Sequence, residues 1–214
     1  MKRLVLASGN PGKLRELSRI LDDLGYELHP QSEFDVPEVA ETGTTFVENA
    51  IIKARHAADC TGLPALADDS GIEVDALDGA PGVYSARFSG ADADDDANNA
   101  LLVEKLREVP AAQRSARYRA VIVLMRHAGD PSPLICEGSW QGMIQLQPAG
   151  DGGFGYDPYF YLPELGCTSA QLDHDEKNRL SHRGQALAEL KRRLSKPGVQ
   201  QHSTTGALHP PAVV

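Results

Sequence analysis

Two adjacent carboxylates are the residues of this chain whose types and spacing most clearly suggest chemistry. Asp68 and Asp69 end the apolar run 63–67, and Ser-Gly and a second alternating run, 72–74, follow them. Neighbouring anions at a strand end repel each other unless a cation is near, and Mg²⁺ takes one or two carboxylates plus substrate phosphates. Asp, Ser and Gly are also ordinary turn residues, so a polar turn between two strands is the alternative interpretation.

A second candidate site is the loop Ser-Gly-Asn-Pro-Gly-Lys at residues 8–13. It follows the apolar run 4–6, which predicts a buried strand, and it precedes leucines and an isoleucine at helical spacing over residues 14–24. The free N–H groups of a helix N-terminus beside Lys13 would suit an anion. The loop matches neither the Walker A nor the Gly-x-Gly-x-x-Gly motif, and an ordinary strand-to-helix turn is the alternative.

Residues 152–158, Gly-Gly-Phe-Gly-Tyr-Asp-Pro, form a loop of glycines and aromatic residues. Glycines let a backbone approach a ligand closely, and Phe154 and Tyr156 have flat faces on which a base could stack. Asp157 adds a hydrogen-bond acceptor. Turn formation alone would explain the same composition.

The elements that must position these residues are readable from the pattern. A capping box, Thr45 to Glu48, predicts a helix that runs to about residue 58 and carries Lys53. Residues 116–125 predict a long central strand, and 134–144 its neighbour, bulged or bent because glycines interrupt it.

Further charged residues support two interpretations each. Arg87 could face phosphate or anchor an acidic loop. The acidic run 91–96 could bind a metal, but a solvated loop before a helix over 98–106 is the favoured interpretation. Lys177 falls in a polar helical turn, and Ser181 opens the last helix, whose leucines repeat at helical spacing.

Composition limits the classes of protein that this chain could be. Its 214 residues allow one sizeable core, and a net charge of −9 argues against non-specific binding to nucleic acid or to an anionic membrane. The three cysteines have no Cys-x-x-Cys pair and indicate reduced thiols in a cytoplasmic protein. We expect one two-lobed domain over residues 1–195 and a disordered tail over 196–214, which is rich in Pro, Gly, Gln and Ser.

Six segments, in order, resemble the inosine triphosphate pyrophosphatase family, which removes noncanonical purine nucleotides. They are Ser-Gly-Asn-Pro-Gly-Lys at 8–13, Glu-Thr-Gly-Thr-Thr-Phe-Val-Glu-Asn-Ala at 41–50, Ala-Asp-Asp-Ser-Gly-Ile at 67–72, Gly-Ala-Pro-Gly-Val-Tyr-Ser-Ala-Arg at 79–87, Gly-Phe-Gly-Tyr-Asp-Pro at 153–158 and Ser-His-Arg-Gly-Gln-Ala at 181–186. The resemblance implies hydrolysis of dITP, ITP and XTP to the monophosphate and pyrophosphate, which keeps deaminated purines out of DNA and RNA.

The resemblance also implies roles for individual residues. Asp69 would be the general base and a ligand of the cofactor Mg²⁺, with Glu41 and Asp68 supporting the metal. The substrate would be bound by Ser8, Gly9, Asn10, Pro11, Gly12, Lys13, Lys53, Ser70, Phe154, Gly155, Tyr156, Asp157, Lys177, His182 and Arg183. Among these, residues 154–157 would stack on the purine and read its edge, together with Lys177, His182 and Arg183.

The fold that the resemblance implies is an α/β, two-lobed structure around a long, twisted mixed sheet with flanking helices. The nucleotide would lie in the cleft between the lobes, and the protein would be a homodimer. Three rival functions are less consistent with the sequence. The set of motifs argues against a pyrophosphatase for modified pyrimidine or methylated nucleotides, and the presence of both Asp68 and Asp69 beside the lysines argues against a nucleotide-binding regulator without catalysis. The missing glycine fingerprint argues against a nicotinamide-dependent oxidoreductase.

Overall fold

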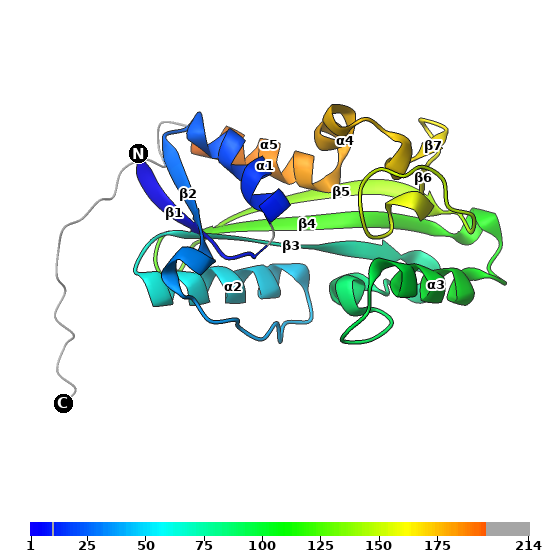
Figure 1. The fold of residues 1–214 in the computed structure, drawn as a ribbon, viewed down its shortest axis with the longest axis horizontal. Coiled ribbons are helices and arrows are strands. Elements are labelled where there is room, and N and C mark those ends of the chain that lie inside the picture. Colours follow the sequence, from blue (N-terminus) through cyan, green and yellow to red (C-terminus); the bar gives the residue numbers. More distant parts are fainter. Residues whose placement is uncertain (10, 196–214) are drawn as a thin grey trace.

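One twisted mixed sheet runs through the whole molecule (Figure 1). The computed structural model describes residues 1–9 and 11–195, so Asn10 and the tail predicted at 196–214 lie outside the described residues. The strands follow the order β2-β1-β3-β4-β5-β6-β7. Their bounds are β1 Lys2–Leu6, β2 Tyr26–Pro30, β3 Ala65–Val74, β4 Ser115–Met125, β5 Leu134–Ile144, β6 Phe160–Leu162 and β7 Cys167–Thr168. β1 is parallel to β2 and β3, and the other pairs are antiparallel, which confirms the predicted fold class.

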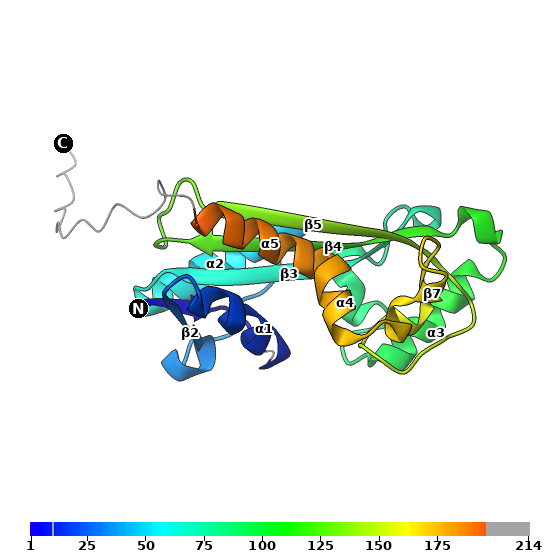
Figure 2. The same ribbon diagram turned by 90° about the horizontal axis from the view of Figure 1, so that it is seen from above.

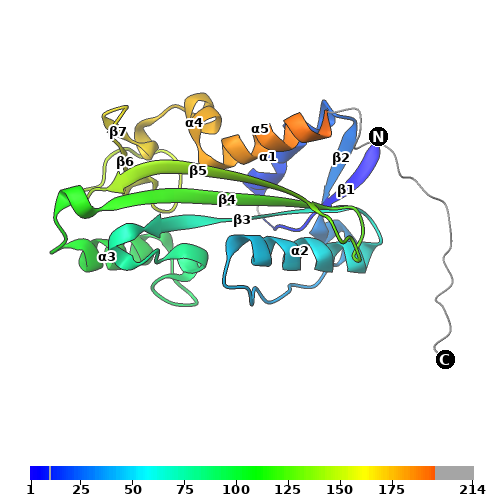
Figure 3. The same ribbon diagram turned by 180° about the vertical axis from the view of Figure 1, so that it is seen from behind.

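Helices cover both faces of this sheet. α1 (Pro11–Asp22), α4 (His174–Leu180) and α5 (His182–Leu194) lie on one face, and α2 (Phe46–Thr61) lies on the other (Figures 1 and 3). α3 (Asp95–Leu106) lies at the far end of the sheet, where its buried leucines pack with Ile72 and Tyr118, whose side chains point to the same face as those beneath α5. Seen from above, β3, β4 and β5 extend from the α1–α2 end to the α3 end (Figure 2). No helix of residues 1–9 and 11–195 has the length and apolar character to cross a membrane.

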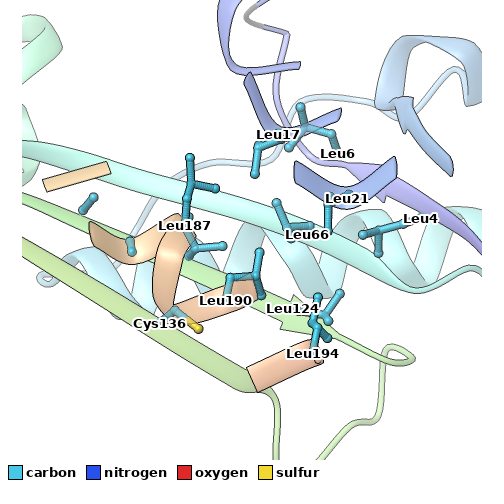
Figure 4. Close-up of a cluster of buried hydrophobic side chains, with 13 residues drawn as sticks. Leu4, Leu6, Leu17, Leu21, Leu66, Leu124, Cys136, Leu187, Leu190 and Leu194 are labelled. Carbon is cyan, nitrogen blue, oxygen red and sulfur yellow. The ribbon is translucent and has the colours of Figure 1, made fainter. Parts of the chain in front are cut away.

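Strand alternation decides which side chains each helix meets, because successive residues of a strand point to opposite faces. Leu66 and Leu124 belong to the apolar cluster beneath α1 and α5 (Figure 4), whereas Ala67 and Val121 belong to the cluster beneath α2. A third cluster, at the other end of the sheet, packs α3 against β6. Two helix-covered ends therefore share one set of long strands.

One expectation about the strands is wrong, and a second is narrowed. The acidic pair does not end a strand or form a turn: β3 continues through it, with Asp68 opposite Ile122 and Asp69 opposite Val121. Of the two alternatives predicted for β5, a bulge or a bend, the bulge is absent, because β5 pairs residue for residue with β4 from Met143 to Leu134.

The glycines of β5 instead make room for neighbouring segments. A Cβ at Gly138 would collide with the carbonyl oxygen of His182 at the start of α5, and one at Gly142 would lie 2.6 Å from the Phe160 ring. Glycine in a strand interior often marks such a close approach. Gly138 thus lets the N-terminus of α5 lie directly on the sheet.

The helix starts largely follow prediction. Thr45 and Glu48 form the expected capping box at α2, and Ser181 accepts a hydrogen bond from Gly184 N–H at the start of α5. α3 begins at Asp95, three residues before the predicted start, because the side chain of Asp94 caps the N–H of Ala97.

Candidate active site

A cavity opens where β1 ends and β3 continues. The pairing of β1 with β3 stops at Leu6 and Leu66, and the chain then leaves the sheet toward α1. Ligands of α/β sheets bind outside the carboxyl ends of parallel strands, and this crevice is such a place. Its volume is about 450 Å³. It is lined by Ala7, Ser8, Gly9, Lys13, Gln31, Pro37, Glu38, Val39, Glu41, Lys53, Asp68 and Arg87.

Asp69 belongs to a chain of alternating charges on the α2 face. Lys53 Nζ, from α2, lies 2.8 Å from Asp69 Oδ1 and 2.9 Å from Glu41 Oε1. Arg87 Nη1 lies 3.6 Å from the other Glu41 oxygen. Of the two interpretations of Arg87, this contact fits the anchoring of an acidic residue, although Arg87 also lines the cavity.

Asp68 meets a separate pair of cations on the opposite face. Its Oδ2 lies 2.9 Å from Lys13 Nζ in α1 and 3.8 Å from Arg183 Nε in α5. The side chain is only 2 % exposed, and its Oδ1 is buried without a hydrogen-bond partner among the described residues.

Strand alternation therefore separates the two carboxylates that the sequence places side by side. Each has its own lysine, whose positive charge compensates the negative charge of the carboxylate. The sequence-based argument that adjacent anions need a cation is correct, but α1 and α2 supply the cations.

The two carboxyl groups have opposite pKa shifts. Burial raises the pKa of Asp69 above its usual value, and Lys53 only partly opposes this. Burial would also raise the pKa of Asp68, but Lys13 and Arg183 outweigh it and hold that pKa below its usual value. For Lys53, burial is outweighed by Asp69 and Glu41, so its pKa is raised and it stays charged. Asp69 is thus the better proton acceptor of the pair.

The three predicted metal ligands do not form a ready-made cage. Among the residues that the structure describes, no three His, Cys, Asp or Glu side chains are grouped so that they could hold a metal ion. Glu41, Asp68 and Asp69 nevertheless provide the carboxylate oxygens that Mg²⁺ prefers. The unpartnered Oδ1 of Asp68 is one such oxygen.

The loop at residues 153–157 presents one aromatic ring to solvent. Phe154 is 63 % exposed, with Lys177 Nζ 5.4 Å and Arg183 Cζ 5.9 Å from its ring centroid. Asp157 Oδ2 accepts hydrogen bonds from Phe154 N–H and from Lys177, and Ser169 donates to Oδ1. Gly153 has no room for a side chain, because a Cβ would collide with Asp157 and Lys177.

Two predicted base-binding residues are turned into the protein. Tyr156 is buried and its hydroxyl donates to the carbonyl of Ser85, so its ring offers no stacking face in this structure. The ring of His182 stacks on the ring of Tyr118, with the two ring centroids 4.7 Å apart. Burial, together with Arg183 and Lys177, lowers the pKa of His182 to about 3, so its imidazole is neutral.

The remaining predicted residues lie around the cavity. Ser8 and Gly9 line it. Pro11 and Gly12 begin α1, and Ser70 is a half-buried residue of β3. Arg183 joins the two groups, because it lies near both Asp68 and the Phe154 ring.

Sequence reasoning missed several residues around these groups. Gln31 and residues 37–39 line the cavity, and Asp95 and Asn99 of α3 hydrogen-bond the backbone of Gly155. Two consecutive asparagines at 98 and 99 were the available signal, because asparagine is a poor residue for a helix interior.

Comparison with known proteins identifies relatives along almost the whole described chain. The sequence model of the Ham1 family matches residues 4–193. A dITP/XTP pyrophosphatase of Vibrio cholerae is 58 % identical over 190 residues, which are 89 % of this chain and 95 % of that protein. A dITP/XTP pyrophosphatase of Xanthomonas campestris is 61 % identical over 194 residues, or 91 % of this chain and 98 % of that protein.

Solved structures have the same fold. A HAM1 protein from Coxiella burnetii superposes with a TM-score of 0.89 at 53 % identity, covering 91 % of this chain and 99 % of that one. A nucleoside-triphosphatase / dITP/XTP pyrophosphatase from Mycobacterium abscessus superposes with a TM-score of 0.76 at 45 % identity. The match covers 88 % of this chain and 97 % of that one. The residues matched by the family model, 4–193, include every site residue described above.

Proposed function

The chain belongs to the Ham1 family, and we propose that it hydrolyses deaminated purine nucleoside triphosphates, namely dITP, ITP and XTP. The products are the nucleoside monophosphate and pyrophosphate. Relatives of 58 % and 61 % identity carry the name dITP/XTP pyrophosphatase, which supports this substrate class.

The observation that carries the proposal is the position of Arg183. This residue lies between the buried carboxylate of Asp68 and the exposed ring of Phe154. A charged cavity suited to phosphates and an aromatic platform suited to a base therefore adjoin each other. A nucleotide bound across Arg183 would use both.

Asp69 is the proposed general base. It would accept a proton from a water molecule whose oxygen attacks the α-phosphorus, while the bond from that phosphorus to the oxygen bridging to the β-phosphate breaks. Pyrophosphate leaves with that oxygen. The raised pKa of Asp69 fits a proton acceptor, since a carboxylate of ordinary pKa is a weak base near neutrality.

Lys13 and Lys53 are the proposed phosphate ligands. In the structure each lysine is paired with a carboxylate of β3. A triphosphate would offer these lysines new anionic partners, and the carboxylates would become available to Mg²⁺ and to water. Glu41, Asp68 and Asp69 are the residues that would hold Mg²⁺, which would supply the positive charge that the polyphosphate and the leaving pyrophosphate need.

Base selection follows from hydrogen bonding at the 6-position. Hypoxanthine and xanthine carry an oxo group there, so a donor such as Arg183 or a backbone N–H would be satisfied. Adenine carries an amine at this position and would leave the donor unpaired, which is costly away from water. Arg183→Ala should therefore reduce the preference for ITP over ATP.

We propose a cytoplasmic homodimer, as expected from the family resemblance. β5 pairs with β6 at only two residues, Met143 and Ile144, which supports an edge that a second subunit could cover. Light scattering in solution would test the dimer; a monomeric mass at micromolar concentration would contradict it.

The direct test of the function is pyrophosphate release from ITP, dITP, XTP, ATP and GTP, with Mg²⁺ and with EDTA. We expect Mg²⁺-dependent turnover of the first three and much slower turnover of ATP and GTP. Equal rates with all five would overturn the substrate class, and undiminished activity in EDTA would overturn the metal requirement.

A further inference from the structure

We propose that Asp95 and Asn99 of α3 are positioning residues that hold the Phe154 platform in place for the purine. This inference rests on the proposed function, because it assigns a role within nucleotide binding. Neither residue touches the charged cavity. Both contact the backbone of Gly155, the residue that follows Phe154.

The two side chains form hydrogen bonds with both backbone polar groups of Gly155. Asp95 Oδ2 accepts a hydrogen bond from Gly155 N–H at 2.7 Å, and Asn99 Nδ2 donates one to Gly155 C=O at 2.9 Å. The pair lies at positions i and i+4 of a helix, so both side chains point from the same face. With N–H and C=O both held, the orientation of this residue is defined.

Gly155 is the position at which the loop most needs such support. Its φ is +60°, a left-handed conformation that glycine adopts freely, so the residue itself does little to restrict the backbone. Phe154 is 63 % exposed, and Lys177 Nζ and Arg183 Cζ lie 5.4 and 5.9 Å from the centroid of its ring. Packing alone therefore does not fix the ring, and the adjoining backbone must do so.

Figures 1 and 2 show why α3 can serve as the anchor. The yellow segment before β6 lies beside α3 at the end of the sheet opposite β1. Leu102 and Leu106 of α3 are fully buried in the core cluster there. The anchoring side chains thus belong to a rigid element, whereas Phe154 belongs to a loop.

The energetic consequence is a lower cost of binding. A stacking platform that must be ordered when the base arrives loses part of its binding energy to conformational entropy. Asp95 and Asn99 would avoid that cost by ordering residues 154–156 in the free protein. They should influence how tightly the nucleotide binds and leave the hydrolytic step unchanged.

The test compares four variants of the full chain by ITP kinetics. Asp95→Ala and Asn99→Ala should each raise KM about tenfold, the factor lost with one charge-assisted or buried hydrogen bond, with kcat within about twofold of wild type. Asp95→Asn keeps an oxygen acceptor and should restore KM to within about threefold. Asp96→Ala is the control, because it removes the same charge from the same helix turn at an exposed residue that makes no hydrogen bond or ion pair with the described loop residues.

Amide hydrogen exchange at residues 153–157 provides a readout that does not depend on turnover. Exchange should be faster in the two alanine variants than in Asp96→Ala. The proposal is overturned if KM in both alanine variants equals that of Asp96→Ala, if kcat falls while KM is unchanged, or if exchange is unaltered. If the wild type releases no pyrophosphate from any purine triphosphate, the proposed function fails, and the exchange measurement still decides whether this pair orders the loop.

Discussion

The two ends of the candidate site are built in different ways. At the cavity end, Asp68 and Asp69 lie on a central strand, and their lysines come from α1 and α2. At the loop end, Phe154 lies on a glycine-rich loop that is held by hydrogen bonds to its backbone.

This difference matches what each end would bind. A polyphosphate carries concentrated charge, and buried charges of fixed position on strands and helices stabilise it strongly because they need no reorganisation. A purine offers a flat apolar face and a few polar edge atoms, for which an exposed ring on an anchored loop is sufficient. Variants at the cavity end should therefore change rate, and variants at the loop end should change affinity.

The largest effect should come from Asp69→Asn. Asparagine has nearly the same shape but cannot accept the proton of the attacking water, so pyrophosphate release should fall at least about 100-fold. KM for ITP should change much less. Glu73→Gln is a matched control on the same strand, since Glu73 pairs with Arg117 and is absent from the cavity lining. If Asp69→Asn retained more than a tenth of the wild-type kcat, Asp69 would not be the general base.

The second largest effect on activity should come from Lys53→Met. It removes a charged partner of phosphate, so kcat/KM for every triphosphate should fall by about tenfold or more. The pH profile should also move. Lys53 lowers the pKa of Asp69, so its removal raises that pKa, and the acid limb of kcat/KM should shift to higher pH. A limb that stays in place or moves to lower pH would show that Asp69 does not control it.

Phe154→Ala should act on affinity. Loss of base stacking costs ~1–3 kcal/mol, so KM for ITP should rise about 5- to 150-fold while kcat changes less. Phe154→Tyr retains an aromatic face and should remain close to wild type. If kcat fell as steeply as in Asp69→Asn, with KM unchanged, the contrast between the two ends would be wrong.

The smallest effect on turnover should come from Thr45→Ala at the cap of α2. It removes the capping hydrogen bond to Glu48 N–H and should cost about 1 kcal/mol of unfolding free energy, or roughly 2–4 °C in Tm. ITP kinetics should stay within about twofold, because packing of α2 on the sheet still holds Lys53. Thermal unfolding and kinetics of the same samples would check both statements, and a tenfold loss of kcat would indicate that the cap positions Lys53.

Local patterns in the sequence predicted much of this structure. Helix and strand periodicity located β4, β5 and the body of α2, and the capping box located the start of that helix. Such signals depend on neighbouring residues alone. They failed at β3, where two aspartates and a glycine resembled a turn, because cross-strand pairing with β4 outweighs the weak strand propensity of those residues.

The sequence by itself determined the family, the residue types of the site and the order of its motifs along the chain. Only the tertiary structure decided that Asp68 and Asp69 face opposite sides of the sheet, each with its own lysine, and that Tyr156 is buried while Phe154 is exposed. The partners of these residues lie 16 to 115 positions away: Lys53 for Asp69, Lys13 for Asp68, Arg183 for Asp68. Contacts over such separations depend on sheet register and helix placement, which no local pattern encodes.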